Sequence, residues 1–203
     1  MTIKNKFLRL ISFLFYFSLL CLQSPSVFAT SILSLSFNQV VNKSALVFEG
    51  TVIDQEVSSN PFGQQIMTYV TFNVTDVIKG EYSQSTIRLG FLGGKLENRG
   101  LFISGLNVPA LGEHGIYFVA PGHRIHPLVG WSQGHFLVKN KESGVQVQTS
   151  RGTTVSKVVK KLVSSQMISK GIADGIITNS TTEQALTLQE FKTSIKTISE
   201  NVQ

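Results

Sequence analysis

Residues 67–80, MTYVTFNVTDVIKG, decide the fold of this 203-residue chain. Apolar and polar side chains alternate along the middle of the stretch, in the order Val70, Thr71, Phe72, Asn73, Val74 and Thr75. A two-residue period is typical of a β-strand that has one buried face and one solvated face. β-Branched and aromatic residues favour the same structure, and Gly80 ends it. We therefore predict a central antiparallel strand over this stretch.

The residues before this stretch predict its neighbours. Residues 45–57 form an apolar, β-branched run, which indicates a second long strand. Gly50 lies inside this run, where a β-bulge or a sharp bend is the usual explanation. A polar loop over 58–63 then joins the two strands into a hairpin. Ahead of them, apolar residues at helical spacing predict a short helix over 36–43, with Ser36 as its N-cap.

Short runs separated by turn signals follow the two long strands. We expect 128–131 and 135–138 to pair as a hairpin with its bend at 132–134, and 145–148 to form an edge strand. Several short strands with this spacing are typical of an all-β sandwich or barrel. Further strands are predicted over residues 86–91, 101–103 and 116–119.

The stretch 93–115 differs from its surroundings because it is rich in glycine and irregular. A long irregular segment inside a compact domain is uncommon and is often a binding loop. Exposed Phe102 and Leu106, flanked by Lys95 and Arg99, would form an apolar anchor with a basic rim. We therefore place the candidate partner-binding site on these four residues.

Beyond residue 150 the pattern becomes helical. Apolar residues at helical spacing over 155–163 predict an amphipathic helix, and the polar segment 169–183 predicts a loop. Thr187 and Glu190 have the spacing of a capping box and precede a closing helix. The apolar stripe of that helix is Leu188, Phe191, Ile195 and Ile198. The predicted domains are a signal peptide over 1–29, a barrel over 30–150 and a helical extension over 151–203.

The first 29 residues have the pattern of a secretory signal peptide. A basic start is followed by an uncharged apolar run over 10–22, and Ala29 is a small residue at the expected cleavage position. We expect export to a periplasm or to the outside of the cell, with Thr30 as the first mature residue. A retained membrane anchor is the first alternative, but the run is shorter than the roughly 20 residues that span a bilayer. Lipid attachment at Cys21 is the second.

Removal of this segment changes the charge and the cysteine content. Cys21 is the single cysteine, so the mature chain would hold no disulfide and no thiolate. Loss of three of the 18 basic residues leaves 15 against 12 acidic residues, or about +3. Such a mild charge does not indicate nucleic-acid binding. Trp131 would be either an exposed stacking platform or a core residue.

Catalytic and metal-binding patterns are weak. His123, His126 and His135 are candidate zinc ligands, but we see no nearby carboxylate to orient a ring, so we predict no metal and no other cofactor. Asp54 and Glu56 share a strand face in a polar region, which favours a solvated strand end over a catalytic pair. The sequence therefore predicts no catalytic residue.

Three segments together carry a resemblance to a known group of proteins. They are Tyr69–Gly80, residues 105–118 with Gly105, Pro109 and the Gly112-Glu113 pair, and residues 127–138 with Gly130, Gln133, Gly134 and Phe136. Their order and spacing resemble uncharacterised exported bacterial proteins whose core is similar to the netrin-like domain, the OB-type barrel of tissue inhibitors of metalloproteinases. The resemblance implies a closed or partly open antiparallel OB-type barrel with a short N-terminal helix and C-terminal helices.

The resemblance also implies a function in protein binding. We expect an exported, non-enzymatic module that binds a secreted or envelope protein, such as a protease. We expect no binding to nucleic acid and no transmembrane segment after signal cleavage. The zinc-chelating N-terminal cysteine of the metalloproteinase inhibitors has no counterpart at Thr30. The alternatives are an envelope enzyme or protease inhibitor with an unidentified site, and a structural envelope component. The sequence leaves the oligomeric state open.

Overall fold

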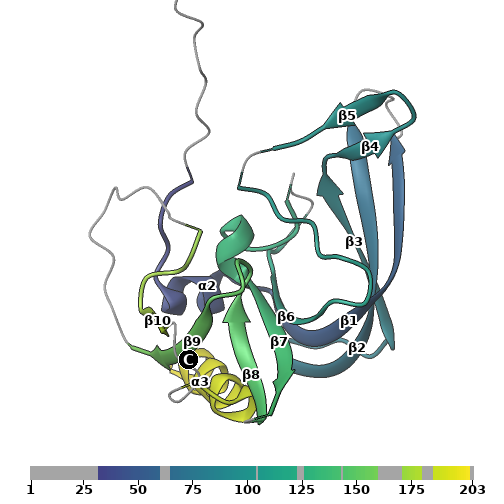
Figure 1. The fold of residues 1–203 in the computed structure, drawn as a ribbon. Coiled ribbons are helices and arrows are strands. Elements are labelled where there is room, and N and C mark those ends of the chain that lie inside the picture. Colours follow the sequence, from purple (N-terminus) through teal and green to yellow (C-terminus); the bar gives the residue numbers. More distant parts are fainter. Residues whose placement is uncertain are drawn as a thin grey trace, which may run out of the picture. The chain divides into compact units, whose positions relative to one another are not determined.

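The computed structural model describes residues 32–59, 65–103, 105–122, 126–142, 144–159, 171–179 and 185–201 (Figure 1). All of them belong to the unit Ser31–Gln203. The predicted signal peptide, its cleavage site and His123 lie outside the described residues.

One large antiparallel sheet dominates the described residues. Its strand order is β10-β9-β8-β7-β6-β1-β2-β3, and a separate hairpin pairs β4 with β5. The prediction of a mainly β, antiparallel fold is confirmed. The strands are β1 (Leu46–Ser59), β2 (Ile66–Lys79), β3 (Thr86–Leu92), β4 (Gly94–Leu96), β5 (Arg99–Leu101), β6 (His114–Val119), β7 (His135–Lys141), β8 (Gly144–Thr149), β9 (Thr154–Val158) and β10 (Ile176–Asn179).

Of the two predicted forms, a closed or a partly open barrel, the closed one is wrong for the part of the chain that the structure describes. The outermost strands of the sheet are β3 and β10, and the sheet does not close on itself. Phe91 of β3 packs edge-on against the ring of His126 at 5.3 Å. The strand predicted over 67–80 is long and antiparallel, but it lies next to the edge instead of at the centre.

The β1–β2 ladder shifts register at three points, one of them at the position predicted for a bulge or bend. The ladder slips between Glu49 and Gly50, which confirms the predicted bulge. A Cβ on Gly50 would lie 2.7 Å from the carbonyl oxygen of Asn73, so a side chain does not fit there. The other two shifts fall between Val47 and Phe48 and between Val52 and Asp54, and the last one leaves Ile53 as an extra residue of β1. Such an extra residue changes which side chains face each side of the sheet.

The predicted N-terminal helix is confirmed as α2 (Phe37–Lys43). Ser36 caps it through a capping box with Gln39. Its C-terminal end is held by Lys79 at the end of β2, whose ammonium group donates to the carbonyl oxygens of Val41 at 2.6 Å and Ser44 at 2.8 Å. Burial lowers the pKa of Lys79. The sequence placed only a strand end at this lysine.

Replacing Lys79 by methionine is expected to lower the free energy of unfolding by about 2 kcal/mol, because charge-assisted hydrogen bonds to the helix end are lost. Urea denaturation followed by circular dichroism measures the change. The control is Lys43→Met, which removes an exposed lysine from the same helix end and should cost no more than about 0.5 kcal/mol. Equal losses from both variants would contradict a specific role of Lys79.

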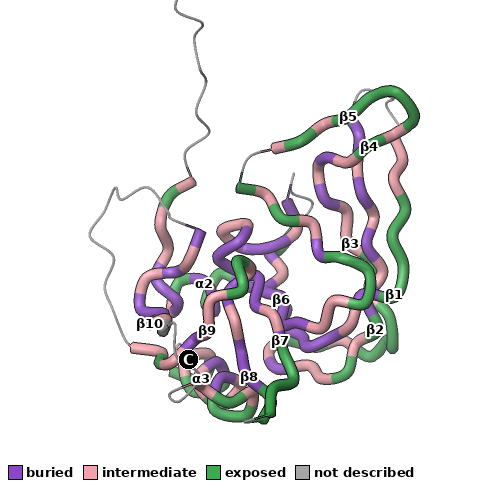
Figure 2. Tube along the Cα trace, viewed as in Figure 1, coloured by how far each residue is buried: buried purple, intermediate pink, exposed green. Residues whose placement is uncertain are grey.

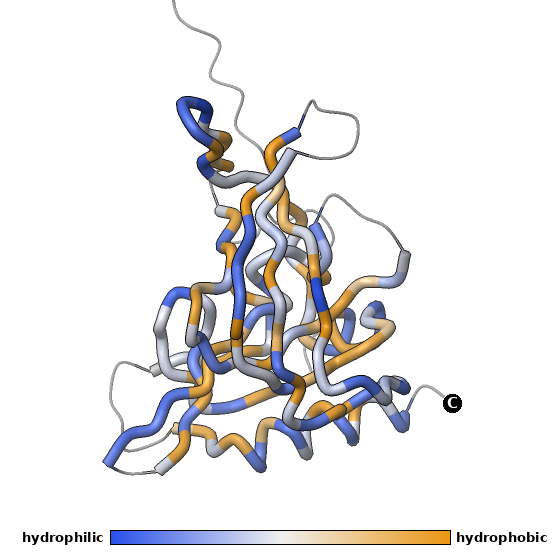
Figure 3. Tube along the Cα trace, turned by 90° about the vertical axis from the view of Figure 1, so that its right-hand side faces the viewer, coloured by the Kyte–Doolittle hydropathy of each residue, from blue (hydrophilic) through white to orange (hydrophobic). Residues whose placement is uncertain are grey.

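The closing helix is confirmed as α3 (Leu188–Glu200), which Thr187 and Glu190 begin with the predicted capping box. Phe191 and Ile195 are fully buried, whereas Ile198 is only partly buried. Hydrophobic and hydrophilic residues alternate along this helix in Figure 3, which shows it leading to the C-terminus. Among the described residues no helix is both long and apolar enough to cross a membrane.

Both helices pack on one hydrophobic core. Phe37 lies at the centre of an aromatic cluster, with its ring centroid 5.7 Å from Phe118, 5.9 Å from Phe136 and 5.3 Å from Phe191. A second core forms between β1, β2, β3 and β6 around Phe48, Phe72 and Tyr117. Because cores lie on both sides of β1, its first five residues are all buried (Figure 2).

An ion cluster fixes α3 to β1 and β2. Lys192 is only 13% exposed and pairs with Glu49 of β1 and, at 2.8 Å, with Asp76 of β2. His114 of β6 lies 2.7 Å from the second carboxylate oxygen of Glu49. Burial lowers the pKa of Lys192, but hydrogen bonds to Asp76 and Glu49 and the charges of both outweigh it, so the pKa is raised. This cluster was not visible in the sequence pattern.

The predicted hairpin of 128–131 with 135–138 is wrong. Gly130 and Trp131 both have a φ of 60°, and the chain forms a short 3-10 helix, η1 (Trp131–Gly134). Val129 donates its N–H to Phe118, so this segment contacts the end of β6. β7 pairs instead with β6 and β8. Trp131 is half-buried and stacks on His126 at 5.5 Å.

Three predictions for residues beyond 144 also need correction. β8 is not an edge strand, because β9 pairs with it. The helix predicted over 155–163 is wrong over its first four residues, since β9 is a strand whose Val155 is fully buried; residues 160–163 lie outside the described ones. The segment predicted as a loop over 169–183 contains β10. Apolar residues spaced three apart fit a helix locally, but pairing with β10 makes residues 154–158 a strand.

Candidate partner-binding site

The glycine-rich stretch after β3 begins with a hairpin. β4 and β5 pair antiparallel, and β5 lies two residues before the predicted strand over 101–103. Gly93 has a φ of 108° and Gly94 a φ of 134°, a region that L-residues rarely adopt. A Cβ on Gly94 would lie 2.6 Å from the hydroxyl oxygen of Thr68. The two glycines are therefore required for the sharp entry into the hairpin.

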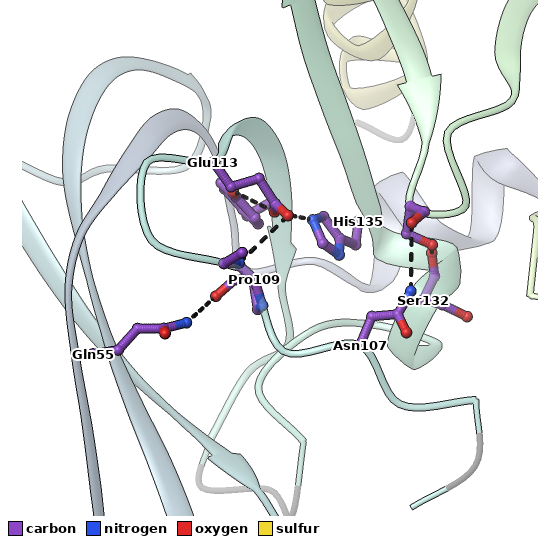
Figure 4. A network of polar contacts seen from close by, with 9 residues as sticks. Gln55, Asn107, Pro109, Glu113, Ser132 and His135 are labelled. Carbon is purple, nitrogen blue, oxygen red and sulfur yellow. Dashed lines mark hydrogen bonds and ion pairs between the residues drawn. The ribbon is translucent and has the colours of Figure 1, made fainter. Parts of the chain in front are cut away.

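After the hairpin, a network of polar contacts holds the chain between Phe102 and β6 (Figure 4). The side-chain amide of Gln55 on β1 donates to the carbonyl oxygen of Pro109. The amide of Asn107 donates to the carbonyl oxygen of Ser150 at 3.4 Å, and the hydroxyl of Ser150 donates to Ser132 at 3.3 Å. The loop is thus tied to β1 on one side and to η1 and the turn after β8 on the other.

Glu113 is the main anchor of this loop. Its carboxylate lies 2.7 Å from Nε2 of His135, accepts from the hydroxyl of Tyr117 at 3.2 Å and accepts from the N–H of Ala110 at 3.4 Å. Burial raises the pKa of Glu113, but the hydrogen bond and charge of His135, together with the other donors, lower it overall. Burial and the charge of Glu113 raise the pKa of Tyr117 well above its usual value. Glu113 therefore stays ionised and Tyr117 stays protonated.

A pocket of about 430 Å³ lies beneath the loop and the hairpin. Its walls are mostly apolar, and the hydroxyl of Thr68 within it donates to the carbonyl oxygen of Gly93 at 2.7 Å. Its lining includes Gln55, Val57, Thr68, Phe102, Leu106 and Val108. The pocket is therefore suited to apolar side chains.

Phe102 is a large apolar side chain of this pocket that is exposed to solvent. It lines the pocket and is 81% exposed. Leu111 and Ile53 are 66% and 50% exposed but do not line the pocket. The N–H of Gly112 donates to the carbonyl oxygen of Val52, which brings Leu111 beside β1. Large side chains at the edge of a pocket are typical of binding hot spots.

The four predicted site residues divide into two pairs. Phe102 and Leu106 both line the pocket. Lys95 and Arg99 lie on β4 and β5 near the tip of the hairpin, where both are exposed, and neither lines the pocket (Figure 2).

Sequence reasoning missed two pocket residues on β1. Gln55 and Val57 are two residues apart and lie on the same face of β1. Regular alternation would put them on the face opposite Val52, but the extra residue at Ile53 puts them on the same face as Val52. Simple counting along the strand therefore places them on the wrong side. Asp54 and Glu56, tested as a catalytic pair, are both exposed, and Glu56 forms an ion pair with Arg88 at 2.6 Å.

Two of the three tested histidines are buried close to one another. His126 and His135 are 4% and 2% exposed, and the charge of His135 contributes to the lowered pKa of His126. The expectation that no carboxylate lies near these rings is wrong, because Glu113 contacts His135. Within the described ranges, no group of three or more His, Asp or Glu side chains is arranged to hold a metal ion.

The burial of His126 predicts a pH dependence of stability. Burial lowers its pKa to about 4, although a contact with the backbone of Leu128 opposes the shift. An unfolded histidine titrates near pH 6.5, so between pH 6.5 and 4 the unfolded chain binds the extra proton. The free energy of unfolding is therefore expected to fall by about 2 kcal/mol from pH 7 to pH 5. Urea denaturation across this range measures the loss.

The control for this pH dependence is His126→Phe, which keeps an aromatic ring against Phe91 and Trp131 but does not titrate. The loss between pH 7 and pH 5 should shrink by about 2 kcal/mol in this variant. An unchanged pH profile would show that His126 does not cause the loss. Below about pH 4.5, protonation of Glu113, whose pKa is lowered in the folded chain, adds a separate loss.

The site therefore combines an apolar pocket, exposed apolar side chains and a loop held by polar contacts. Comparison with protein-family models, curated proteins and solved structures finds no match for this chain.

Proposed function

We propose that this chain is an exported, non-enzymatic module that binds a partner protein through the pocket and the loop above it. The proposal includes a core of the netrin-like, OB type, in which the sheet is open instead of closed. It also includes removal of residues 1–29 as a signal peptide, so that the module acts in a periplasm or outside the cell.

The observation that supports this proposal is the pocket lined by Phe102 and Leu106. Binding energy at protein interfaces concentrates in a few large side chains at the edge of well-formed pockets. Phe102 is 81% exposed beside such a pocket, although burial of a phenylalanine side chain is favourable by about 2 kcal/mol. A partner that covers Phe102 and inserts an apolar side chain into the pocket would gain this energy.

The hairpin would add charge at the rim of the same surface. Lys95 and Arg99 are exposed and lie on neighbouring strands, where Leu96 is the Cα partner of Arg99. Rim charges mainly raise the association rate and are sensitive to salt. We therefore expect the partner to be acidic around its apolar contact.

Substitution of Leu106 by aspartate is expected to weaken partner capture from an envelope extract by at least tenfold, because a buried charge in the pocket costs more than about 1.4 kcal/mol. Quantitative mass spectrometry of the captured proteins measures the effect. Phe102→Ala should weaken capture of the same protein. The matched control is Val145→Asp, which changes an exposed apolar residue of β8 and should leave capture unchanged.

Two results would overturn the proposal. The first is equal capture by the Leu106 variant and by the unchanged protein, and the second is equal loss from Leu106→Asp and Val145→Asp. Circular dichroism of each variant checks that the fold is retained. For export, N-terminal sequencing of the protein from the envelope fraction should begin at Thr30, and a start at Met1 would contradict signal removal.

A further inference from the structure

The outer half of β1 has an open side that faces away from β2. β6 pairs with β1 only as far as Thr51, whose Cα partner is His114. Val52 then exchanges backbone hydrogen bonds with Gly112 and Glu113. From 54 to 59, the backbone of β1 pairs only with β2 among the described residues. β1 is thus an interior strand over its first half and an edge strand over its second half.

An edge strand presents unpaired N–H and C=O groups. In an antiparallel pair, alternate residues direct these groups toward the partner strand and the others direct them away from it. The four residues 53–56 are all exposed, as expected where the backbone edge and one face are both uncovered. The groups along this edge repeat with the spacing of an extended chain.

The pocket opens beside this same edge. The extra residue at Ile53 turns Gln55 and Val57 toward the pocket. Leu106 and Val108 form the opposite wall. A chain lying along the edge would therefore direct every second side chain between Val57 and Leu106.

We propose that the partner supplies an extended peptide segment that adds to β1 as a further strand along 54–59, with an apolar side chain in the pocket. This inference rests on the proposed function and specifies the form of the partner. Only an extended backbone matches a row of alternating donors and acceptors, and backbone pairing with side-chain pockets is an established mode of peptide recognition. The bound peptide would lie on the same side of β1 as β6, beyond Thr51, where the pairing with β6 ends.

The test uses the purified full chain and linear ten-residue peptides displayed on phage. Selected peptides should carry apolar residues at alternating positions. The best peptide is then synthesised with single N-methyl groups at successive residues, which remove one backbone donor each. N-methylation at one alternating set should weaken binding about tenfold for each position, the worth of one hydrogen bond, while the other set should change it less than about twofold. Leu106→Asp should also weaken binding at least tenfold.

The outcomes separate this inference from the proposed function. If Leu106→Asp abolishes binding but both N-methyl sets have equal effects, the pocket binds a partner without strand addition, and the inference is wrong. If selection enriches no peptide while envelope capture still depends on Phe102, the partner is not an extended segment. If sedimentation shows a dimer that Leu106→Asp dissociates, a second copy of this chain occupies the edge, and the inference is again overturned.

Discussion

Replacement of Phe37 by alanine is expected to lower the free energy of unfolding by about 4 kcal/mol. Phe37 is fully buried and contacts the rings of Phe118, Phe136 and Phe191 at once. Alanine would leave a cavity between α2, α3 and the sheet and would remove three ring contacts. Urea denaturation at pH 7, followed by tryptophan fluorescence and circular dichroism, measures the loss.

The matched control is Phe102→Ala, which makes the same chemical change at a residue that is 81% exposed. Its cost should be no more than about 0.5 kcal/mol, because little buried surface is lost. The two variants also separate a structural role from a binding role. Phe37→Ala should lower stability, whereas Phe102→Ala should weaken partner capture. A cost below about 1 kcal/mol for Phe37→Ala would show that α2 does not pack on the core as described.

Replacement of Lys192 by methionine is expected to cost about 4 kcal/mol. Its ammonium group lies between Glu49 and Asp76, and the Glu49 side chain is only 9% exposed. Methionine keeps most of the length of the side chain but removes the ammonium group, so the buried Glu49 carboxylate retains only its contact with His114. The cost arises mainly from this uncompensated charge, so the position of α3 on β1 and β2 is weakened. Thermal unfolding and urea denaturation measure the effect.

Two further variants check the cause. Lys196→Met removes an exposed lysine from the same helix and should change stability by no more than about 0.5 kcal/mol. The double variant Glu49→Gln with Lys192→Met should recover part of the loss, because no buried carboxylate then remains without a partner. A double variant less stable than Lys192→Met alone would contradict this explanation.

The limit of the β1–β6 pairing and the candidate site are connected. β6 begins at His114 and pairs with β1 only as far as Thr51, so the outer half of β1 stays uncovered. The loop before β6 is held by Gln55 and Glu113. The polar contacts of the loop therefore have a structural role, because they keep the pocket walls in place. The largest binding effects are expected at Phe102 and Leu106.

Of the four residues that the sequence predicted for the candidate site, Phe102 and Leu106 line the pocket. The density of glycine over 93–115 predicted a segment without long regular structure, and Phe102 and Leu106 stand out there as large apolar residues. Lys95 and Arg99 lie on the hairpin but do not line the pocket. Gln55 and Val57 were missed because the bulge at Ile53 is not encoded by glycine, as the bulge at Gly50 is.

The sequence by itself determined the elements whose signals are local. Ser36 and Thr187 begin the two helices through capping boxes, and the alternation around Phe72 defines a strand. These depend on contacts within four residues or on a two-residue period.

Only the tertiary structure decided which strands pair and where pairing ends. The strand at Val155, the short 3-10 helix after Gly130, and the ion cluster around Lys192 all depend on residues far away in the chain. Sheet closure is likewise a global property, because it requires two edge strands to meet, and no local pattern records whether β3 and β10 do so. The free edge of β1 also depends on distant residues, because it begins where the pairing with β6 ends at Thr51.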